Sequence, residues 1–304
     1  MAEWRHIPEA GTVWGIRALV LLARTCGRRI AGWFLYLVAL YYAIVRGTAR
    51  RASRDYLQRV GHSATFASIV RHLHMFAQVS LDRLFFLTGR WDAFQFEQRN
   101  HDQLVEIART GRGVLLLGAH LGSFEVMRCR AQQVGVPINV VVDFSNAERL
   151  SAVVRSLDPG VDTRLISLAE DPIAAVLAIR AAIDRGELVA ILGDRLPAAR
   201  PGKPGAPRQV TSQFLGADVA LPAGPWLLAH ALRCPVYFVA GIYTRPNRYT
   251  LHFELLANEV RLERHARAAS LARYARTYAA MLETHVHAAP LNWFNFFDFW
   301  SHRD

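Results

Sequence analysis

Lysine and cysteine are nearly absent from this 304-residue chain. Lys203 is the only lysine, and the three cysteines, Cys26, Cys129 and Cys234, lie far apart with no metal-binding spacing. An odd, scattered set of cysteines argues against a disulfide framework and favours a reducing compartment. Charged residues make up 20% of the chain and hydrophobic residues 52%, which is apolar for a soluble enzyme.

Negative charge is also scarce, since the formal net charge is +11 and arginine supplies nearly all of the positive charge. A basic, apolar chain favours anionic partners, either a membrane surface or nucleic acid. The arginines between positions 46 and 59 directly follow an apolar stretch. Lipid headgroups are the simpler partner for an apolar stretch that is followed by arginines. No nucleic-acid partner is expected.

No apolar run reaches the ~20 residues that span a bilayer with certainty. The longest is Ile30–Val45, with 16 uncharged residues between Arg28-Arg29 and Arg46. As a helix it extends about 24 Å, and no small-residue cleavage site follows it. We expect a helix that lies in one leaflet of a membrane. A tilted single span and a buried core helix are the alternatives.

Beyond this segment, apolar strands and amphipathic helices alternate, which predicts an α/β fold with a mainly parallel central sheet flanked by helices. We expect two parts, a membrane-associating helical segment at 1–60 and an α/β domain at 61–304. The expected strands are a short one around Phe94 and Phe96, then Val114–Leu117, Ile138–Val142, Val189–Leu192, Val236–Tyr243 and Tyr249–Leu256. The expected helical stretches are Arg50–Gly89, Asn100–Thr110, Ser123–Val134, Glu148–Leu157, Pro172–Arg185, Leu221–Leu232 and Ser270–His285, and a loop that covers the substrate is expected at Pro197–Gln213.

His120 follows one of these strands at its carboxyl end, where open α/β sheets bind ligands. Glu125 lies five residues later, and a turn between them would let the carboxylate orient the ring. A histidine with an acidic partner is a ready general base. Gly122 permits close approach of a ligand, and Ser123 is a candidate cap for the next helix, whose first amides would face the histidine. The alternative is that both polar side chains only complete a strand and a solvated helix.

Further candidate substrate-binding residues follow other expected strands. Asp194 and Arg195 lie at a strand end, where the arginine would hold an anionic group or a developing oxyanion, and a structural ion pair is the alternative. Arg149 is a candidate anion ligand, with a solvated helix face as the alternative. Phe214 and Gly216 would shape an acyl or acceptor pocket, or only pack.

Other catalytic chemistries find little support. The pairs His72/His74 and His285/His287 have a spacing that a metal could use, but a helix separates such residues by about 200° and no third ligand is evident, so no metal is expected. Ser123 lacks the Gly-x-Ser-x-Gly elbow of serine hydrolases. The aromatic-rich segment Trp293–Trp300 is expected to pack on the core.

Four segments together resemble the lysophospholipid and lipid A acyltransferase superfamily, and within it the bacterial lauroyl/myristoyl transferase branch. They are Gly118–Glu125 with its His-x4-Glu motif, Val189–Pro197, Phe214–Pro225 and Asn292–Trp300. Asp194-Arg195 departs from the Asp-Gln turn of the lipid A enzymes. The chain is equally similar to acyltransferases of aryl polyene or unusual-lipid pathways, so the resemblance leaves the acceptor open.

The resemblance implies an enzyme that transfers an acyl chain from acyl carrier protein or coenzyme A to a hydroxyl or amine of a membrane lipid. It implies His120 as the base, Glu125 as its partner, no cofactor beyond the acyl donor, and a place on the cytoplasmic face of a bacterial inner membrane. Two alternatives remain: a non-catalytic lipid-binding scaffold of the same fold, and a thioesterase-like hydrolase.

Overall fold

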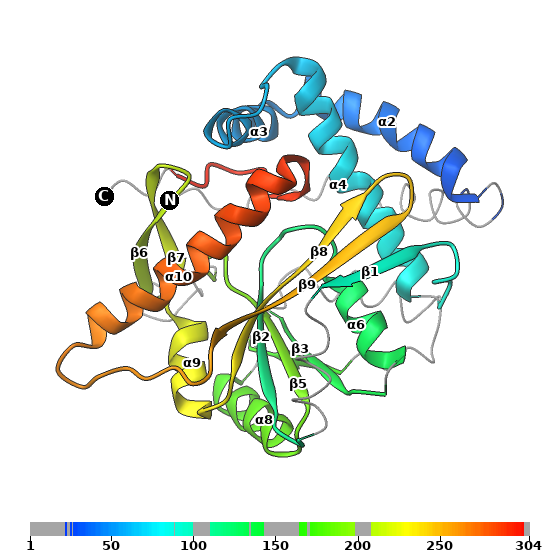
Figure 1. Ribbon diagram of the computed structural model, residues 1–304. Coiled ribbons are helices and arrows are strands. Elements are labelled where there is room, and N and C mark those ends of the chain that lie inside the picture. Colours follow the sequence, from blue (N-terminus) through cyan, green and yellow to red (C-terminus); the bar gives the residue numbers. More distant parts are fainter. Residues whose placement is uncertain are drawn as a thin grey trace.

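The computed structural model describes residues 27–87, 89–99, 110–133, 135–142, 164–168, 171–197 and 208–300, together with Leu22 and Thr25. It has the expected α/β fold, with a mainly parallel seven-stranded sheet in the order β1-β9-β8-β2-β5-β3-β4 (Figure 1). Only β1 and β9 run opposite to the other five strands, because β9 is antiparallel to β8 and parallel to β1. The strands are β1 (Gln95–Arg99), β2 (Val114–Gly118), β3 (Ile138–Val142), β4 (Leu165–Ser167), β5 (Leu188–Leu192), β8 (Val236–Thr244) and β9 (Arg248–Ala257).

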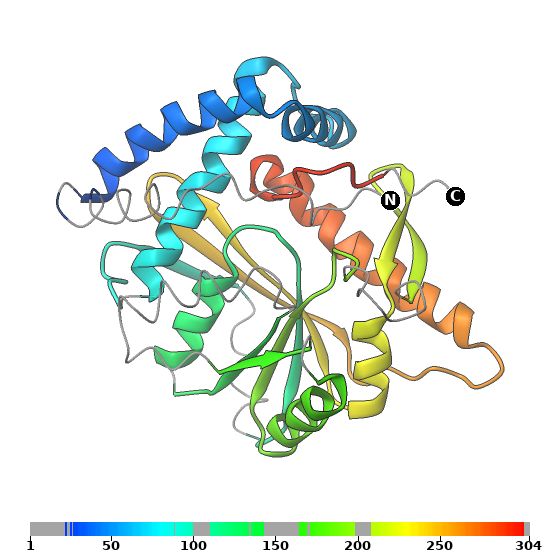
Figure 2. The same ribbon diagram turned by 180° about the vertical axis from the view of Figure 1, so that it is seen from behind.

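Helices cover both faces of the sheet (Figures 1 and 2). In β2, Leu115 and Leu117 point into one hydrophobic cluster, and Val114 and Leu116 point into the other. This alternation follows from the two-residue period of a strand. The first cluster contains residues of α8 (Pro172–Asp184), α9 (Gly224–Leu232) and α10 (Arg267–Ala288), and the second contains residues of α6 (Phe124–Gln133). Helix α4 (Phe66–Leu87) contributes its first part to the first cluster and the rest to the second.

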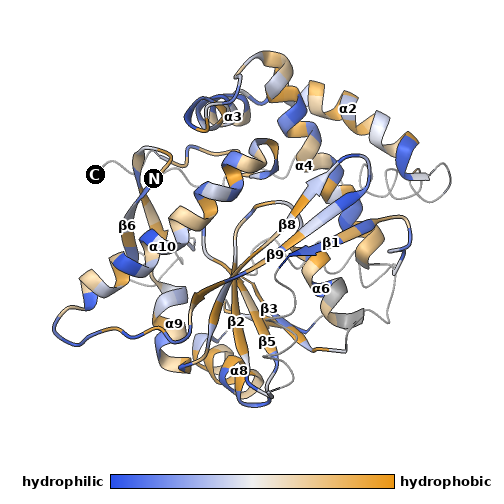
Figure 3. Ribbon diagram, in the orientation of Figure 1, coloured by the Kyte–Doolittle hydropathy of each residue, from blue (hydrophilic) through white to orange (hydrophobic). Residues whose placement is uncertain are grey.

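The described part of the N-terminal segment packs on the rest of the chain. Helix α2 (Gly27–Val45) buries a stripe of Ala31, Leu35, Ala39 and Ala43, and these residues share hydrophobic clusters with α4. Helix α3 (Gly47–Arg59) follows and is mostly hydrophilic (Figure 3). Helix α2 contributes to both clusters that cover the sheet, and α3 contributes to the first. The division at residue 60 stays a prediction.

The opposite face of α2 is apolar and exposed. Trp33 and Leu37 are 81% and 62% exposed. The other exposed large apolar side chains of α2 are Ile30, Phe34, Tyr36, Tyr41, Ile44 and Val45. By length and composition, α2 alone among the described helices could cross a membrane. The alternative of a buried core helix is disfavoured, since most of the large side chains of α2 are exposed.

Several expected elements needed correction. The stretch Arg50–Gly89 contains two helices, α3 and α4, rather than one. Leu221 begins no helix; it lies in β7 (Ala217–Pro222), which pairs with β6 (Gln209–Phe214) in a separate hairpin, and α9 begins only at Gly224. A short apolar run fits a buried strand as well as a helix. The helices expected at 100–110 and 148–157 and most of the loop expected at 197–213 lie outside the described residues.

Candidate active site

The register of two neighbouring strands brings His120 and Asp194 together. Strands β2 and β5 are parallel neighbours, and Gly118 pairs with Leu192. His120 and Asp194 each lie two residues beyond these paired positions, so they leave the sheet at the same edge. The amide of Gly193 donates to the carbonyl of Gly118 and extends the ladder by one step. The site therefore lies at the carboxyl ends of the parallel strands, as expected for an α/β fold.

His120 and Asp194 form a close pair. Nδ1 of His120 lies 2.8 Å from Oδ1 of Asp194, and the backbone amide of His120 donates to Oδ2 at 3.0 Å. Because an ionised carboxylate only accepts hydrogen bonds, Nδ1 carries the proton. Nε2 is then left with the lone pair. The His120 side chain is 28% exposed, whereas Asp194 is fully buried, so the histidine is the accessible member of the pair.

Two residues that follow α10 complete the shell around Asp194. Trp293 donates from Nε1 to Oδ2 at 3.2 Å, and Asn295 donates from Nδ2 to the same oxygen at 2.9 Å. The amide of Phe294 donates to the carbonyl of His120. A buried carboxylate with this many donors stays ionised and fixed in orientation. The segment around Trp293 thus holds both members of the pair.

Trp293 is in turn held by buried polar residues of α3 and α4. His72 contacts the carbonyl of Trp293 through Nε2 at 2.8 Å and Ser53 through Nδ1 at 2.9 Å. Burial lowers the pKa of His72 to about 4, so the ring is neutral. Nε2 must donate to the carbonyl, and Ser53 therefore donates to Nδ1. A chain of hydrogen bonds connects the N-terminal helices to Asp194.

The electrostatics of the pair suit a general base. Burial lowers the pKa of His120 below its ordinary value and the charge of Arg195 lowers it further, although Asp194 acts in the opposite direction. Burial alone raises the pKa of Asp194, but contacts with His120 and the charge of Arg195 outweigh it and keep this pKa low. At neutral pH the pair is therefore a neutral imidazole hydrogen-bonded to a carboxylate.

Glu125 is not the partner of His120, which corrects the expectation from the His-x4-Glu spacing. Its carboxylate contacts Arg83 at 2.8 Å and Arg128 at 2.9 Å. Burial raises the pKa of Glu125, but the two guanidinium groups outweigh burial and keep it below its ordinary value. Among the described residues, no hydrogen bond or ion pair joins Glu125 to His120. Glu125 lies in the first turn of α6 and neutralises Arg128 of the same helix and Arg83 of α4.

Two nitrogens of Arg195 donate hydrogen bonds to the segment after α10. Its Nε donates to Oδ1 of Asn295 at 2.6 Å, and one terminal nitrogen donates to the carbonyl of Phe294 at 2.7 Å. Burial lowers the pKa of Arg195 to about 10, so the group stays charged at neutral pH. A guanidinium has five N–H donors, and a role in binding an anion or an oxyanion stays a prediction.

Gly122 and Ser123 use their amides within the fold. The Gly122 amide donates to the carbonyl of Asn292, and the Ser123 amide donates to that of Gly241. Gly122 has φ +66°, and a Cβ there would lie 1.9 Å from the carbonyl oxygen of Gly241. The glycine is therefore required for close packing on β8. Ser123 directly precedes α6, which is the position expected for a cap. The amides of Gly122 and Ser123 donate to backbone carbonyls and are therefore not the donors for a substrate.

Phe214 and Gly216 have structural surroundings. Phe214 is buried against Trp293 and Trp300, with ring centroids 5.3 and 6.2 Å apart. Gly216 occupies the exposed turn between β6 and β7, where Leu215 and Gly216 both have positive φ. Such a two-residue turn favours glycine. These contacts favour the alternative that both residues only pack or turn the chain over a role in a pocket.

Arg149 lies outside the described residues.

Trp293, Asn295 and His72 were not predicted from the sequence as parts of the site. The aromatic run Trp293–Trp300 was a visible signal, and its expected packing on the core is confirmed, because Trp293, Phe294, Phe299 and Trp300 are buried. The signal for hydrogen bonding was the pair of asparagines in and beside that run, Asn292 and Asn295. The structure buries both of them.

Comparison with known proteins adds no assignment: no family model matches the chain, and no curated protein matches it.

Proposed function

We propose that the protein is a membrane-associated acyltransferase that transfers a fatty acyl chain from an acyl thioester to a hydroxyl or amine of a lipid. The observation that carries the proposal is the contact of 2.8 Å between Nδ1 of His120 and Asp194, which leaves Nε2 as a base at the carboxyl edge of the sheet. The resemblance of four sequence segments to the lysophospholipid and lipid A acyltransferases supports the same chemistry.

In this reaction, Nε2 of His120 accepts the proton of the acceptor hydroxyl as its oxygen attacks the thioester carbonyl. Asp194 stabilises the imidazolium that forms and holds the ring in its orientation. The tetrahedral intermediate collapses, the carbon–sulfur bond breaks, and the leaving thiolate takes the proton from His120. The products are an acylated lipid and a free thiol, of either acyl carrier protein or coenzyme A.

The exposed face of α2 supports membrane association. One side of the helix packs on α4, and Arg28 ties its start to Asp82 through two contacts of 2.6 and 2.7 Å. The other side carries exposed aromatic and aliphatic residues, and Arg51 and Arg54 of the following helix are exposed. A helix attached along one side inserts shallowly into one leaflet rather than crossing it. We propose the cytoplasmic face of a bacterial inner membrane as its location, as the resemblance implies.

Acyl transfer is tested by comparing lipid extracts of cells that express the wild type or His120→Ala. His265→Ala, at an exposed histidine, is the matched control. A lipid heavier by one acyl chain should appear with the wild type and the control only. Purified protein should consume an acyl thioester only when lipid acceptor is present. Consumption without acceptor would indicate a hydrolase, and no consumption would indicate a non-catalytic scaffold; either result overturns the proposal.

Membrane association is tested by flotation with anionic phospholipid vesicles. The double variant Trp33→Glu/Leu37→Glu places two charges on the exposed face of α2 and should abolish flotation. Ile173→Glu changes an equally exposed apolar residue on α8, at the opposite end of the molecule (Figure 1), and should leave flotation unchanged. Equal flotation of all three proteins would contradict insertion through α2.

A further inference from the structure

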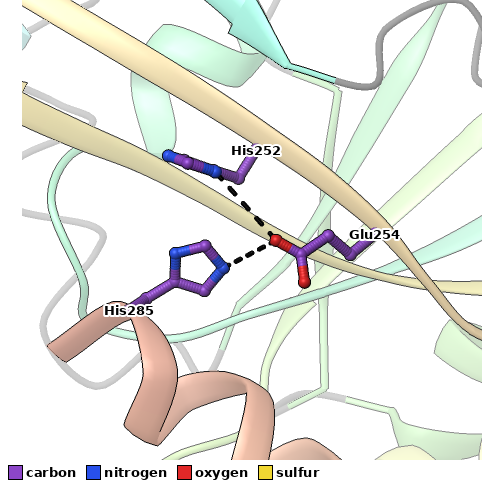
Figure 4. Close-up of side chains that lie close together, drawn as sticks. All are labelled: His252, Glu254 and His285. Atoms are coloured by element: carbon purple, nitrogen blue, oxygen red, sulfur yellow. Dashed lines mark hydrogen bonds and ion pairs between the residues drawn. The ribbon is translucent and has the colours of Figure 1, made fainter. Parts of the chain in front are cut away.

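Three side chains with metal-binding atoms meet on the α10 face of the sheet. His252 and Glu254 come from β9, and His285 comes from α10 (Figure 4). Nε2 of His285 lies 2.8 Å from Oε1 of Glu254, and Nδ1 of His252 lies 4.0 Å from the same oxygen. One donor atom from each residue lies within 4.8 Å of the other two.

The strand pattern explains why these residues converge. In β9, Leu251 and Phe253 point into the cluster under α4 and α6, so His252 and Glu254 point to the other face, toward α10. His285 stacks on Phe238 of β8 at 5.2 Å and meets the ring of His252 at 4.5 Å. These contacts fix two imidazoles and a carboxylate around one point.

The donor set suits a borderline divalent cation. Two histidines and one glutamate, with water as a fourth ligand, form a common zinc site, in which the metal lies about 2.1 Å from each donor and the donors lie about 3.4 Å apart. The observed separations of 2.8 and 4.0 Å differ from this by small side-chain rotations. Glu254 is 32% exposed, which gives a metal ion and a water molecule access to the group.

We propose that His252, Glu254 and His285 bind one divalent transition-metal ion, with Zn²⁺ as the first candidate. This ion is separate from the acyl transfer proposed above, which needs no metal. It would bridge β9 to α10 close to the point where α10 ends and the segment with Trp293 and Asn295 begins. The bound ion would thereby stabilise the segment that holds Asp194.

The sequence alone predicted no metal, and of the two histidine pairs that it offered, only His285/His287 contributes to this cluster. His287 points elsewhere: it is half-exposed and lies 3.8 Å from Glu283 of the same helix. It therefore provides a matched control on the same helix.

The test is zinc binding by the full-length protein after treatment with a chelator and dialysis. His252→Phe keeps a ring against His285 and removes the donor, and it breaks no side-chain hydrogen bond with the described residues. We expect the wild type and His287→Ala to bind one Zn²⁺ per chain by elemental analysis and titration calorimetry. We expect His252→Phe to bind at least tenfold more weakly. Glu254→Gln, which retains a hydrogen-bonding group for His285, should show the same loss.

Thermal unfolding provides a second readout that does not depend on activity. Zn²⁺ should raise the midpoint of the wild type and of His287→Ala by several degrees, since a ligand that binds only the folded state stabilises it. Mg²⁺, which prefers oxygen ligands, should raise neither. Absence of zinc binding by the wild type, equal binding by His252→Phe, or loss of binding in His287→Ala would each overturn the proposal.

Discussion

Two carboxylates near His120 have opposite surroundings. Glu125, five residues away in the chain, lies between Arg83 and Arg128. Asp194, 74 residues away, accepts hydrogen bonds from His120, Trp293 and Asn295. The short distance along the chain suggested Glu125 as the partner of the histidine. The register of two parallel strands selects Asp194 instead. A motif spacing therefore identifies the histidine but not the carboxylate that orients it.

The largest expected effect comes from Asp194→Asn. The amide is nearly isosteric but carries no charge, so it neither stabilises the imidazolium nor fixes the Nδ1 tautomer of His120. We expect the rate of acyl transfer to fall on the order of 10²- to 10⁴-fold, the range of a positioned acid–base group. Glu125→Gln should change the rate much less. Steady-state kinetics of both purified variants decides between the carboxylates, and a larger loss for Glu125→Gln would restore it as the partner.

The second effect is on stability. Glu125→Ala removes the carboxylate that contacts the buried Arg128 at 2.9 Å, and breaking a buried ion pair is costly. We expect a loss of about 3 kcal/mol in the free energy of unfolding, measured by denaturant titration. Glu263→Ala removes an exposed carboxylate and should change this free energy by less than about 0.5 kcal/mol. Equal values for the two variants would show that Glu125 has no such structural role.

The third prediction concerns His72, which supports Trp293 behind Asp194. Its pKa is about 4 in the folded protein and about 6.5 when unfolded. The unfolded chain therefore binds more protons between these values, and stability falls as the pH falls from 6.5 to 4, by about 3 kcal/mol from this group. His72→Gln should remove this part of the pH dependence. Unfolding curves across this range provide the measurement, and an identical slope in the variant would contradict the assignment.

Much of the fold was predictable because its signals are local. The apolar strands at 114–118 and 188–192 are each followed two residues later by a polar residue, His120 and Asp194, and both positions were identified from the sequence. The pairing of these two ends was not predictable, because it depends on which strands are neighbours. The hairpin of β6 and β7 was missed for a related reason: the apolar residues near Leu221 fit a helix until Ala220 and Leu221 are seen to pair across the hairpin.

The segment after α10 determines when the site can exist. Trp293 and Asn295 reach Asp194 across 99 and 101 residues of chain. Contacts this distant in sequence require the closure of a long loop before they contribute. A nascent chain in which His120 and Asp194 have been synthesised, but the segment after α10 has not, therefore lacks the donors that orient them. The hydrogen-bonded arrangement of Asp194 and His120 is therefore complete only when the segment after α10 packs beside them, so that the geometry of the candidate site depends on the last part of the fold.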